Sequence, residues 1–116
     1  MLIVTLQLLL PDNTYLKKLR ELDLGMNSIH AFTDIHSTLF TRLSQLDLSD
    51  NKLSQLDTRV FWDSRRLNRL NLSGNNLTRI DDCALCNTSL NYLNLDRNRI
   101  SRLNPNMFDW VKLKYD

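Results

Sequence analysis

An eleven-residue pattern that occurs four times constrains the fold of this chain more than any other feature of its sequence. In every copy, leucine fills the first, fourth and sixth positions, asparagine fills the ninth, and leucine or isoleucine fills the eleventh. The copies begin at Leu19, Leu43, Leu67 and Leu90, so the repeat lengths are 24, 24 and 23 residues. A period of this length predicts a solenoid, in which each repeat is one structural unit stacked on the next.

The leucines predict a short strand in each repeat. In the first copy, Leu22 and Leu24 are two residues apart, so both side chains lie on one face of a strand and Asp23 lies on the other. Such a strand cannot bury its leucine face alone, and it needs an equivalent strand about 4.8 Å away. We therefore expect a parallel sheet with one strand from each repeat.

The asparagines predict a structural ladder in the turn that follows each strand. A buried turn leaves backbone N–H and C=O groups without partners, and each such group costs about 1–3 kcal/mol. An inward-pointing asparagine carries both donors and an acceptor, so stacked asparagines can satisfy the backbone groups of neighbouring turns. We assign this structural role to Asn27, Asn51, Asn75 and Asn98.

The second half of each repeat is less regular, and we expect irregular turns and short helical pieces there. The stretch 57–62 allows little more than one helical turn. Large apolar residues at positions fourteen and nineteen are expected to fill the space beneath this side. They are Leu56 and Phe61, Ile80 and Leu85, Leu103 and Phe108, with Phe32 and either Leu39 or Phe40 in the first copy.

These features resemble the leucine-rich repeat family over about residues 19–108. The resemblance implies an α/β solenoid: a curved right-handed β-α superhelix with a short parallel β-sheet on its concave face and a mostly irregular convex side. The phrase 47–53 and the phenylalanines at position nineteen resemble the longer repeats of extracellular animal proteins. Toll-like receptor ectodomains and secreted insect immune proteins with leucine-rich repeats are of this type. The resemblance implies innate-immune recognition or receptor assembly.

The repeat boundaries predict one leucine-rich repeat domain over residues 1–116. It divides into a partial repeat at 1–18, four repeats at 19–42, 43–66, 67–89 and 90–112, and the start of a truncated repeat at 113–116. The apolar stretch 1–10 lacks a basic segment and a small-residue cleavage site, which favours a strand or turn of a preceding repeat over a signal peptide. Solenoids need polar caps, and neither end has a cysteine-rich cap. A fragment of a longer protein is the favoured interpretation, with end-to-end stacking or a marginally stable domain as alternatives.

Composition and motifs disfavour several functional classes. A hydrophobic fraction of 42% is enough for a core, and a net charge of +2 is too small to argue by itself for nucleic acid or an anionic membrane. We find no serine–histidine–acid or cysteine–histidine arrangement within one repeat, and no glycine-rich phosphate loop. We therefore predict no catalytic residues, no cofactor and no membrane span. Adjacent Asp81 and Asp82 are interpreted as surface solvation rather than as a catalytic pair.

Cys83 and Cys86 form a C-x-x-C motif on the convex side of the third repeat. A zinc site needs four ligands, and only His30 and His36 remain, two repeats away, so we predict no metal site. A disulfide formed in an oxidising compartment is slightly favoured. Two buried thiols packed against Leu85, or a bond to another chain, remain as alternatives.

Three N-x-Ser/Thr sequons begin at Asn71, Asn76 and Asn87. We expect Asn87 on the convex side and Asn76 at the edge of the solenoid, both accessible to a glycan. Asn71 is expected on the concave face, where a glycan would obstruct ligand binding. If the protein is secreted, its ligand should avoid the centre of the third strand.

The outward-facing positions of the repeats form columns on the concave face. These columns pass from acidic in the first two repeats to neutral and basic in the last two. Tyr92, between Arg69 and Arg97, is the best candidate anchor because tyrosine and arginine are enriched at interface hot spots. Asp23 and Asp47 are like-charged neighbours that either are solvated or await a basic partner. We predict the following ligand-binding residues: Glu21, Asp23, Asp47, Arg69, Tyr92 and Arg97.

A second candidate surface is a basic flank at positions ten and thirteen, formed by Lys52, Arg79, Arg99 and Arg102. With Arg97, this flank could meet an acidic protein, a sulfated glycan or a nucleic-acid backbone. The favoured interpretation is a solvated edge whose charge is balanced by nearby acidic residues, namely Asp57, Asp81 and Asp96.

From these patterns we predict a module for protein–protein interaction or ligand recognition that binds through the concave face and the basic flank. It is expected to be secreted or to belong to the ectodomain of a membrane receptor. The expected partner is a protein or another macromolecule, homo- or hetero-oligomers are open, and nucleic acid or a sulfated glycan is less favoured. The alternatives are a cytoplasmic scaffold or inhibitor, which predicts free thiols, and a structural spacer within a larger receptor.

Overall fold

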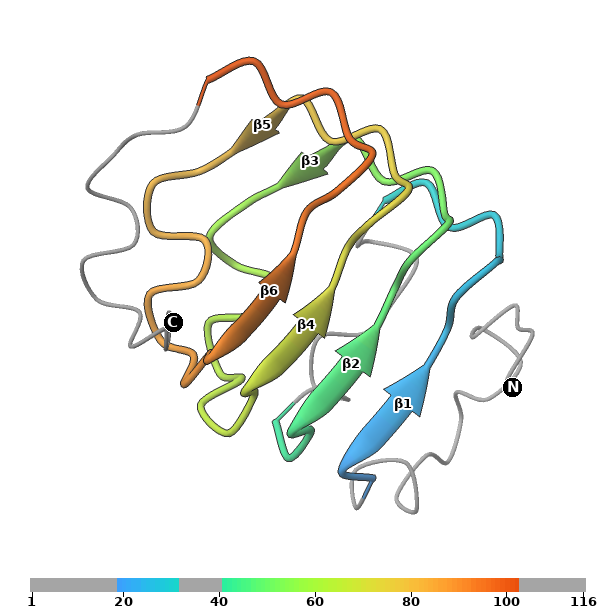
Figure 1. Cartoon of the computed structure of the whole chain (residues 1–116). Helices are drawn as coiled ribbons and strands as arrows, with labels where there is room; N and C mark the ends of the chain where they lie inside the picture. Colours follow the sequence, from blue (N-terminus) through green and yellow to red (C-terminus); the bar gives the residue numbers. More distant parts are fainter. Residues whose placement is uncertain (1–18, 32–40, 103–116) are drawn as a thin grey trace.

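A computed structural model describes residues 19–31 and 41–102 of the chain. Within these ranges the chain forms six short strands and no helix (Figure 1). In chain order the strands are β1 (Glu21–Asp23), β2 (Gln45–Asp47), β3 (Gln55–Leu56), β4 (Arg69–Asn71), β5 (Arg79–Ile80) and β6 (Tyr92–Asn94).

Four of the strands form a parallel sheet in the order β1-β2-β4-β6 (Figure 1). Its register follows the sequence repeat, because the fourth-position leucines lie directly beside one another: Leu22, Leu46, Leu70 and Leu93. The backbone ladder continues beyond the strands, since the N–H of Leu24 donates to the carbonyl of Asp47 at 2.8 Å. The prediction of a parallel sheet with one strand per repeat is therefore confirmed for the described repeats.

The other side of the second and third repeats differs from expectation. It contains a two-stranded parallel sheet, β3-β5, in which Leu56 pairs with Ile80, and turns over 58–63 and 82–87. The expected short helical pieces do not form in the described residues. The backbone hydrogen bonds of these turns explain the absence of helix. For example, Thr88 donates its N–H to the carbonyl of Leu85, three residues earlier, at 3.2 Å. Such bonds close single turns rather than a continuing α-helix.

Leucines fill the core between the two sheets. Leu56 and Phe61, at positions fourteen and nineteen of the second repeat, are almost completely buried, as are Ile80 and Leu85 in the third. Burying one such side chain contributes about 1.5–3 kcal/mol. The corresponding residues predicted for the first and fourth repeats, and the terminal segments 1–18 and 113–116, lie outside the described residues: Phe32, Leu39, Phe40, Leu103 and Phe108.

The described residues contain no helix of the length and hydrophobicity that a membrane crossing requires. The core residues of the described ranges lie in short strands, in turns and in the irregular segments between them.

Candidate interaction surface

The main sheet carries a hollow of 420 Å³ on the face turned away from the leucine core. Strands β1, β2, β4 and β6 all contribute to its lining. The lining includes five of the six residues predicted to bind a ligand on the concave face: Glu21, Asp23, Asp47, Arg69 and Tyr92. We name this feature the concave hollow.

One side of the concave hollow is formed by an arginine stacked on a tyrosine. Arg69 and Tyr92 are direct neighbours on β4 and β6, and the guanidinium carbon lies 4.1 Å from the centre of the tyrosine ring. A cation–π contact at an exposed site contributes about 0.5–1 kcal/mol. Its more important effect is to hold the guanidinium plane, whose N–H groups can bind a carboxylate in two parallel hydrogen bonds.

The acidic side of the hollow has a structural role that the sequence analysis missed. Asp47 accepts a hydrogen bond from the N–H of Ser49 through Oδ1 at 2.8 Å, and Asp23 accepts one from Gly25 at 2.8 Å. The same bond recurs in the later repeats, where Asn71 accepts from Ser73 at 3.0 Å and Asn94 accepts from Asp96 at 2.9 Å.

The residues at position five are therefore turn caps. This role accounts in part for the acidic pair of Asp23 and Asp47, beside solvation or a missing basic partner. One hydrogen bond uses only part of the acceptor capacity of a carboxylate. Asp23 and Asp47 both line the concave hollow, so their charge still faces it.

Arg97, which was predicted to flank Tyr92, forms an ion pair within the column of residues at position eight. Its Nη1 lies 3.1 Å from Oδ1 of Asp50, and the side chains are 66% and 42% exposed. This ion pair spans the third repeat by passing over Gly74, where a Cβ atom would collide with the Asp50 carboxylate. Arg97 is absent from the lining of the hollow, and its charge is offset by Asp50.

The ninth-position asparagines bond to the backbone on both sides of each turn. The side-chain amide of Asn75 donates to three carbonyl oxygens, those of Leu48, Leu72 and Ser73, at 2.9, 3.0 and 3.3 Å. Its Oδ1 accepts from the N–H of Leu53 at 3.0 Å. Asn51 and Asn98 form equivalent hydrogen bonds, both within their own turns and to the preceding repeat.

Asn27, in the first described repeat, bonds within its own turn, to the carbonyls of Leu24 at 2.9 Å and Gly25 at 3.1 Å. In the described ranges, every buried polar atom of a side chain has a hydrogen-bond partner. The four asparagines thus serve the backbone, and they do not reach the concave hollow.

The basic flank is exposed but is not one continuous patch. Arg79 lies 3.8 Å from Asp81, whereas Asp57, which was expected to balance the flank, caps its own turn by accepting from the N–H of Arg59 at 2.8 Å. Position ten is interrupted in the third repeat by an asparagine, Asn76. The full set predicted for this flank is exposed: Lys52, Arg79, Arg99 and Arg102.

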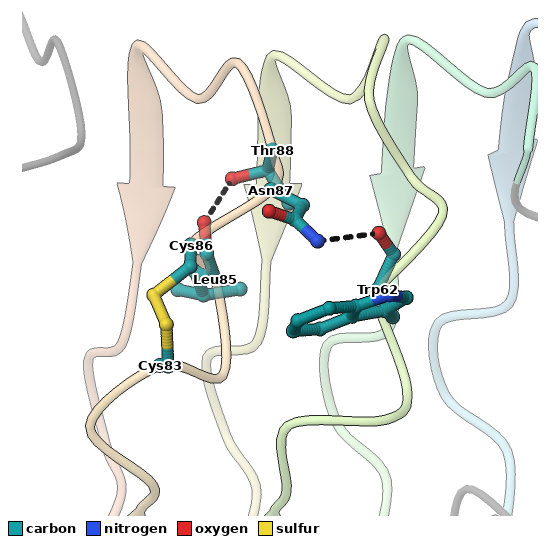
Figure 2. Close-up of a disulfide and its surroundings, with 6 residues drawn as sticks. All are labelled: Trp62, Cys83, Leu85, Cys86, Asn87 and Thr88. Carbon is teal, nitrogen blue, oxygen red and sulfur yellow. Dashed lines mark hydrogen bonds between the residues drawn. A yellow bond between two sulfur atoms is a disulfide. The ribbon is translucent and has the colours of Figure 1, made fainter.

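Cys83 and Cys86 form a disulfide in the convex turn of the third repeat (Figure 2). Their Cα atoms are 4.8 Å apart; Cys83 is exposed, and Cys86 is half-buried. Between them, Leu85 is completely buried in the core. The turn is therefore fixed both by the disulfide and by packing. His36, considered above as a zinc ligand, lies outside the described residues, and within them no group of three or more potential ligands gathers.

The three sequon asparagines have different surroundings. Asn76 is exposed, and Asn71 is half-buried in the lining of the hollow. Asn87 was expected to be accessible, but it is half-buried, and its amide donates to the carbonyl of Trp62 in the preceding repeat at 3.0 Å (Figure 2). That bond joins the two convex turns.

A family model described as leucine rich repeat matches residues 17–77 and 65–114. Because these matches cover most of the chain, the chain belongs to the leucine-rich repeat family. Domains of this family are generally protein-interaction modules and typically are not enzymes. No curated protein matches the chain.

Proposed function

We propose that this chain is an extracellular recognition segment that binds a protein partner in the concave hollow. The observation that carries the proposal is the composition of that hollow, which has carboxylates on β1 and β2 and the stacked Arg69–Tyr92 pair on β4 and β6. The disulfide between Cys83 and Cys86 supports an oxidising compartment. We further propose, from the resemblance of the repeats, a role in innate-immune recognition or in a receptor.

The charges of the hollow define the kind of partner surface that fits it. Glu21, Asp23 and Asp47 favour a basic side chain over the first two strands. Arg69 favours a carboxylate, and the ring of Tyr92 offers an apolar surface beside it. Four strands spaced by about 4.8 Å span about 14 Å, so the partner should present opposite charges at about that separation.

The stacked Arg69–Tyr92 pair should contribute most of the binding free energy. Together with tryptophan, tyrosine and arginine are enriched among the residues whose truncation costs more than about 2 kcal/mol at interfaces. The carboxylates should act mainly on the rate of association and on specificity, because their attraction is screened by salt.

Photo-cross-linking tests this proposal with a matched pair of glutamines. Gln45 lines the concave hollow, whereas Gln55 is an exposed residue of the second sheet. A photoreactive residue at position 45 should capture a protein from the extracellular fluid of the source organism, and the same residue at position 55 should not. The affinity of the recovered protein should then fall at least about ten-fold, or about 1.4 kcal/mol, in Arg69→Ala and in Tyr92→Ala.

Other outcomes would assign another role. Capture at position 55 alone, or unchanged affinity in both variants, would contradict binding in the hollow and favour a structural spacer. Capture from a cytosolic extract but not from extracellular fluid, by a chain with two free thiols, would favour an intracellular scaffold or inhibitor.

A further inference from the structure

The three sequons of this chain are not equivalent in the folded protein. An N-glycan is attached to Nδ2 of asparagine and occupies a large volume at the surface. A site must therefore leave that amide pointing to solvent, and the glycan must not crowd a hydrogen bond of that nitrogen that the fold uses.

Asn71 meets the first requirement poorly, because it is half-buried in the lining of the concave hollow, on a strand that lies between β2 and β6. Its Oδ1 accepts two hydrogen bonds from Ser73, one from the N–H at 3.0 Å and one from the hydroxyl at 2.7 Å. Ser73, the hydroxyl residue of this sequon, is itself buried. A glycan on Asn71 would have to fit against β2, β4 and β6.

Asn87 fails the second requirement. It is half-buried, and its Nδ2, the atom that would carry the glycan, donates to the carbonyl of Trp62 at 3.0 Å. Figure 2 shows this amide directed at the preceding convex turn, above the side chain of Trp62. A glycan would replace one of the two hydrogens on that nitrogen and would crowd the junction between the two turns.

Asn76 meets both requirements. The asparagine ladder uses Asn75, so the next residue along the chain points outward, and Asn76 is exposed. Its backbone is anchored, because its N–H donates to the carbonyl of Leu53 at 2.8 Å. The hydroxyl residue of its sequon, Thr78, is also exposed.

We propose that Asn76 carries an N-linked glycan and that the other two sequons stay largely unmodified. In the modification, Nδ2 forms a bond to the anomeric carbon of an oligosaccharide carried by a lipid pyrophosphate. The bond from that carbon to the pyrophosphate breaks, the pyrophosphate leaves with the electron pair, and the amide nitrogen loses one proton.

The position of this glycan restricts the basic flank. Asn76 occupies position ten of the third repeat, between Lys52 and Arg99 in the stacked column, and all three donate their backbone N–H to the preceding repeat in the same way. A glycan there shields the flank from a large anionic partner. It leaves the concave hollow open, since Asn76 does not line it.

Glycopeptide mapping of the full chain, directed into the secretory pathway of eukaryotic cells, tests the proposal. We expect a glycan on Asn76, loss of one glycan mass in Asn76→Gln, and no loss in Asn71→Asp, which keeps the turn cap but lacks the amide. Thr78→Ser makes the hydroxyl residue the same as in the other two sequons, and Asn76 should remain modified in that variant. The proposal is overturned if Asn76 is unmodified, or if Asn71 or Asn87 is modified to the same extent.

Heparin, used as a sulfated probe, provides a second readout. The Asn76→Gln chain should be retained more strongly on immobilised heparin than the glycosylated chain, because the flank is then uncovered. Equal retention of the two chains would show that the glycan does not shield the basic flank. The inference rests on the extracellular location in the proposed function. These measurements do not involve the concave hollow, so they can fail or succeed independently of binding there.

Discussion

Single asparagines hold the turns of this protein together, because each one substitutes for several missing backbone partners. The amide of Asn75 donates to carbonyls of two repeats, and its oxygen accepts from the N–H of Leu53 in the preceding repeat. An apolar residue of similar size would fill the space but leave these groups unsatisfied.

Asn75→Ala should lower the free energy of unfolding by about 3 kcal/mol or more, because several buried backbone groups lose their partners at about 1–3 kcal/mol each. Equilibrium unfolding in urea measures this change. The neighbouring Asn76→Ala is the control, and it should change stability by less than about 0.5 kcal/mol, since Asn76 is exposed. Equal effects in the two variants would contradict the structural role of the ladder.

Residues at position eight adopt a left-handed backbone in all four described repeats. Gly74 has φ +68°, and three residues with side chains, Met26, Asp50 and Arg97, have φ +55°. The sequence signal for this conformation is weak, because only one of the four residues is glycine. A left-handed residue with a side chain costs about 1–3 kcal/mol.

Met26→Gly should therefore stabilise the chain by about 0.5–1 kcal/mol, once the greater entropy of glycine in the unfolded state is included. Met26 is a suitable site because its side chain is 68% exposed. Thermal unfolding of Met26→Gly and Met26→Ala separates the two possible causes. Equal stabilisation by alanine would show that the exposed side chain, rather than the backbone, was unfavourable.

At the scale of elements, the convex turns have the structure that was hardest to anticipate. The turn 82–87 is closed by the disulfide and is joined to the preceding turn by the bond from Asn87 to Trp62. Such a cross-link acts mainly on local opening, because the closed loop is short.

Replacing both cysteines by serine (Cys83→Ser with Cys86→Ser) should lower stability by at most about 2 kcal/mol, the chain-entropy value for so short a loop. Hydrogen exchange should locate the effect. The amide of Thr88 should exchange at least about ten-fold faster, whereas the amide of Leu72, which donates to Asn94 in the main sheet, should change little. Equal acceleration at both amides would mean that the disulfide acts on global unfolding instead.

The strands of the main sheet end in caps of one kind, with an oxygen at position five accepting from the N–H at position seven. Asp47→Ala should therefore cost about 1 kcal/mol, because the N–H of Ser49 loses its acceptor. Asp47→Asn keeps the acceptor and should stay within about 0.5 kcal/mol of the natural chain. Denaturant unfolding of the two variants compares them, and the cap is refuted if the asparagine variant is as unstable as the alanine variant.

At the scale of the whole molecule, the sequence predicted the structural features that repeat with the period of the chain. The leucine and asparagine positions predicted the parallel sheet and its register, because a stack of identical units has few other ways to bury one leucine face per strand. The strands β3 and β5 were missed, since they contain only two residues each and have no alternating pattern. The Asp50–Arg97 pair was missed because it joins residues that are two repeats apart.

The stack also predicts a gradient of packing along the solenoid. Leu70 lies on β4, an inner strand of the main sheet, and is completely buried, whereas Leu93 lies on β6, at the end of the described sheet, and is only partly buried. Leu70→Ala should cost about 3–5 kcal/mol, and Leu93→Ala should cost less than about half of that. Urea unfolding measures both, and equal costs would show that β6 is covered as completely as β4.

The caps at position five have a consequence for how the charge of the concave hollow can vary. Aspartate and asparagine both supply the oxygen that the turn requires, and the four repeats use two of each: Asp23, Asp47, Asn71 and Asn94. The two residues differ by one unit of charge and hardly at all in shape. Related chains could thus change the potential over the sheet one repeat at a time, by a single amide-to-acid exchange, while every turn keeps its geometry.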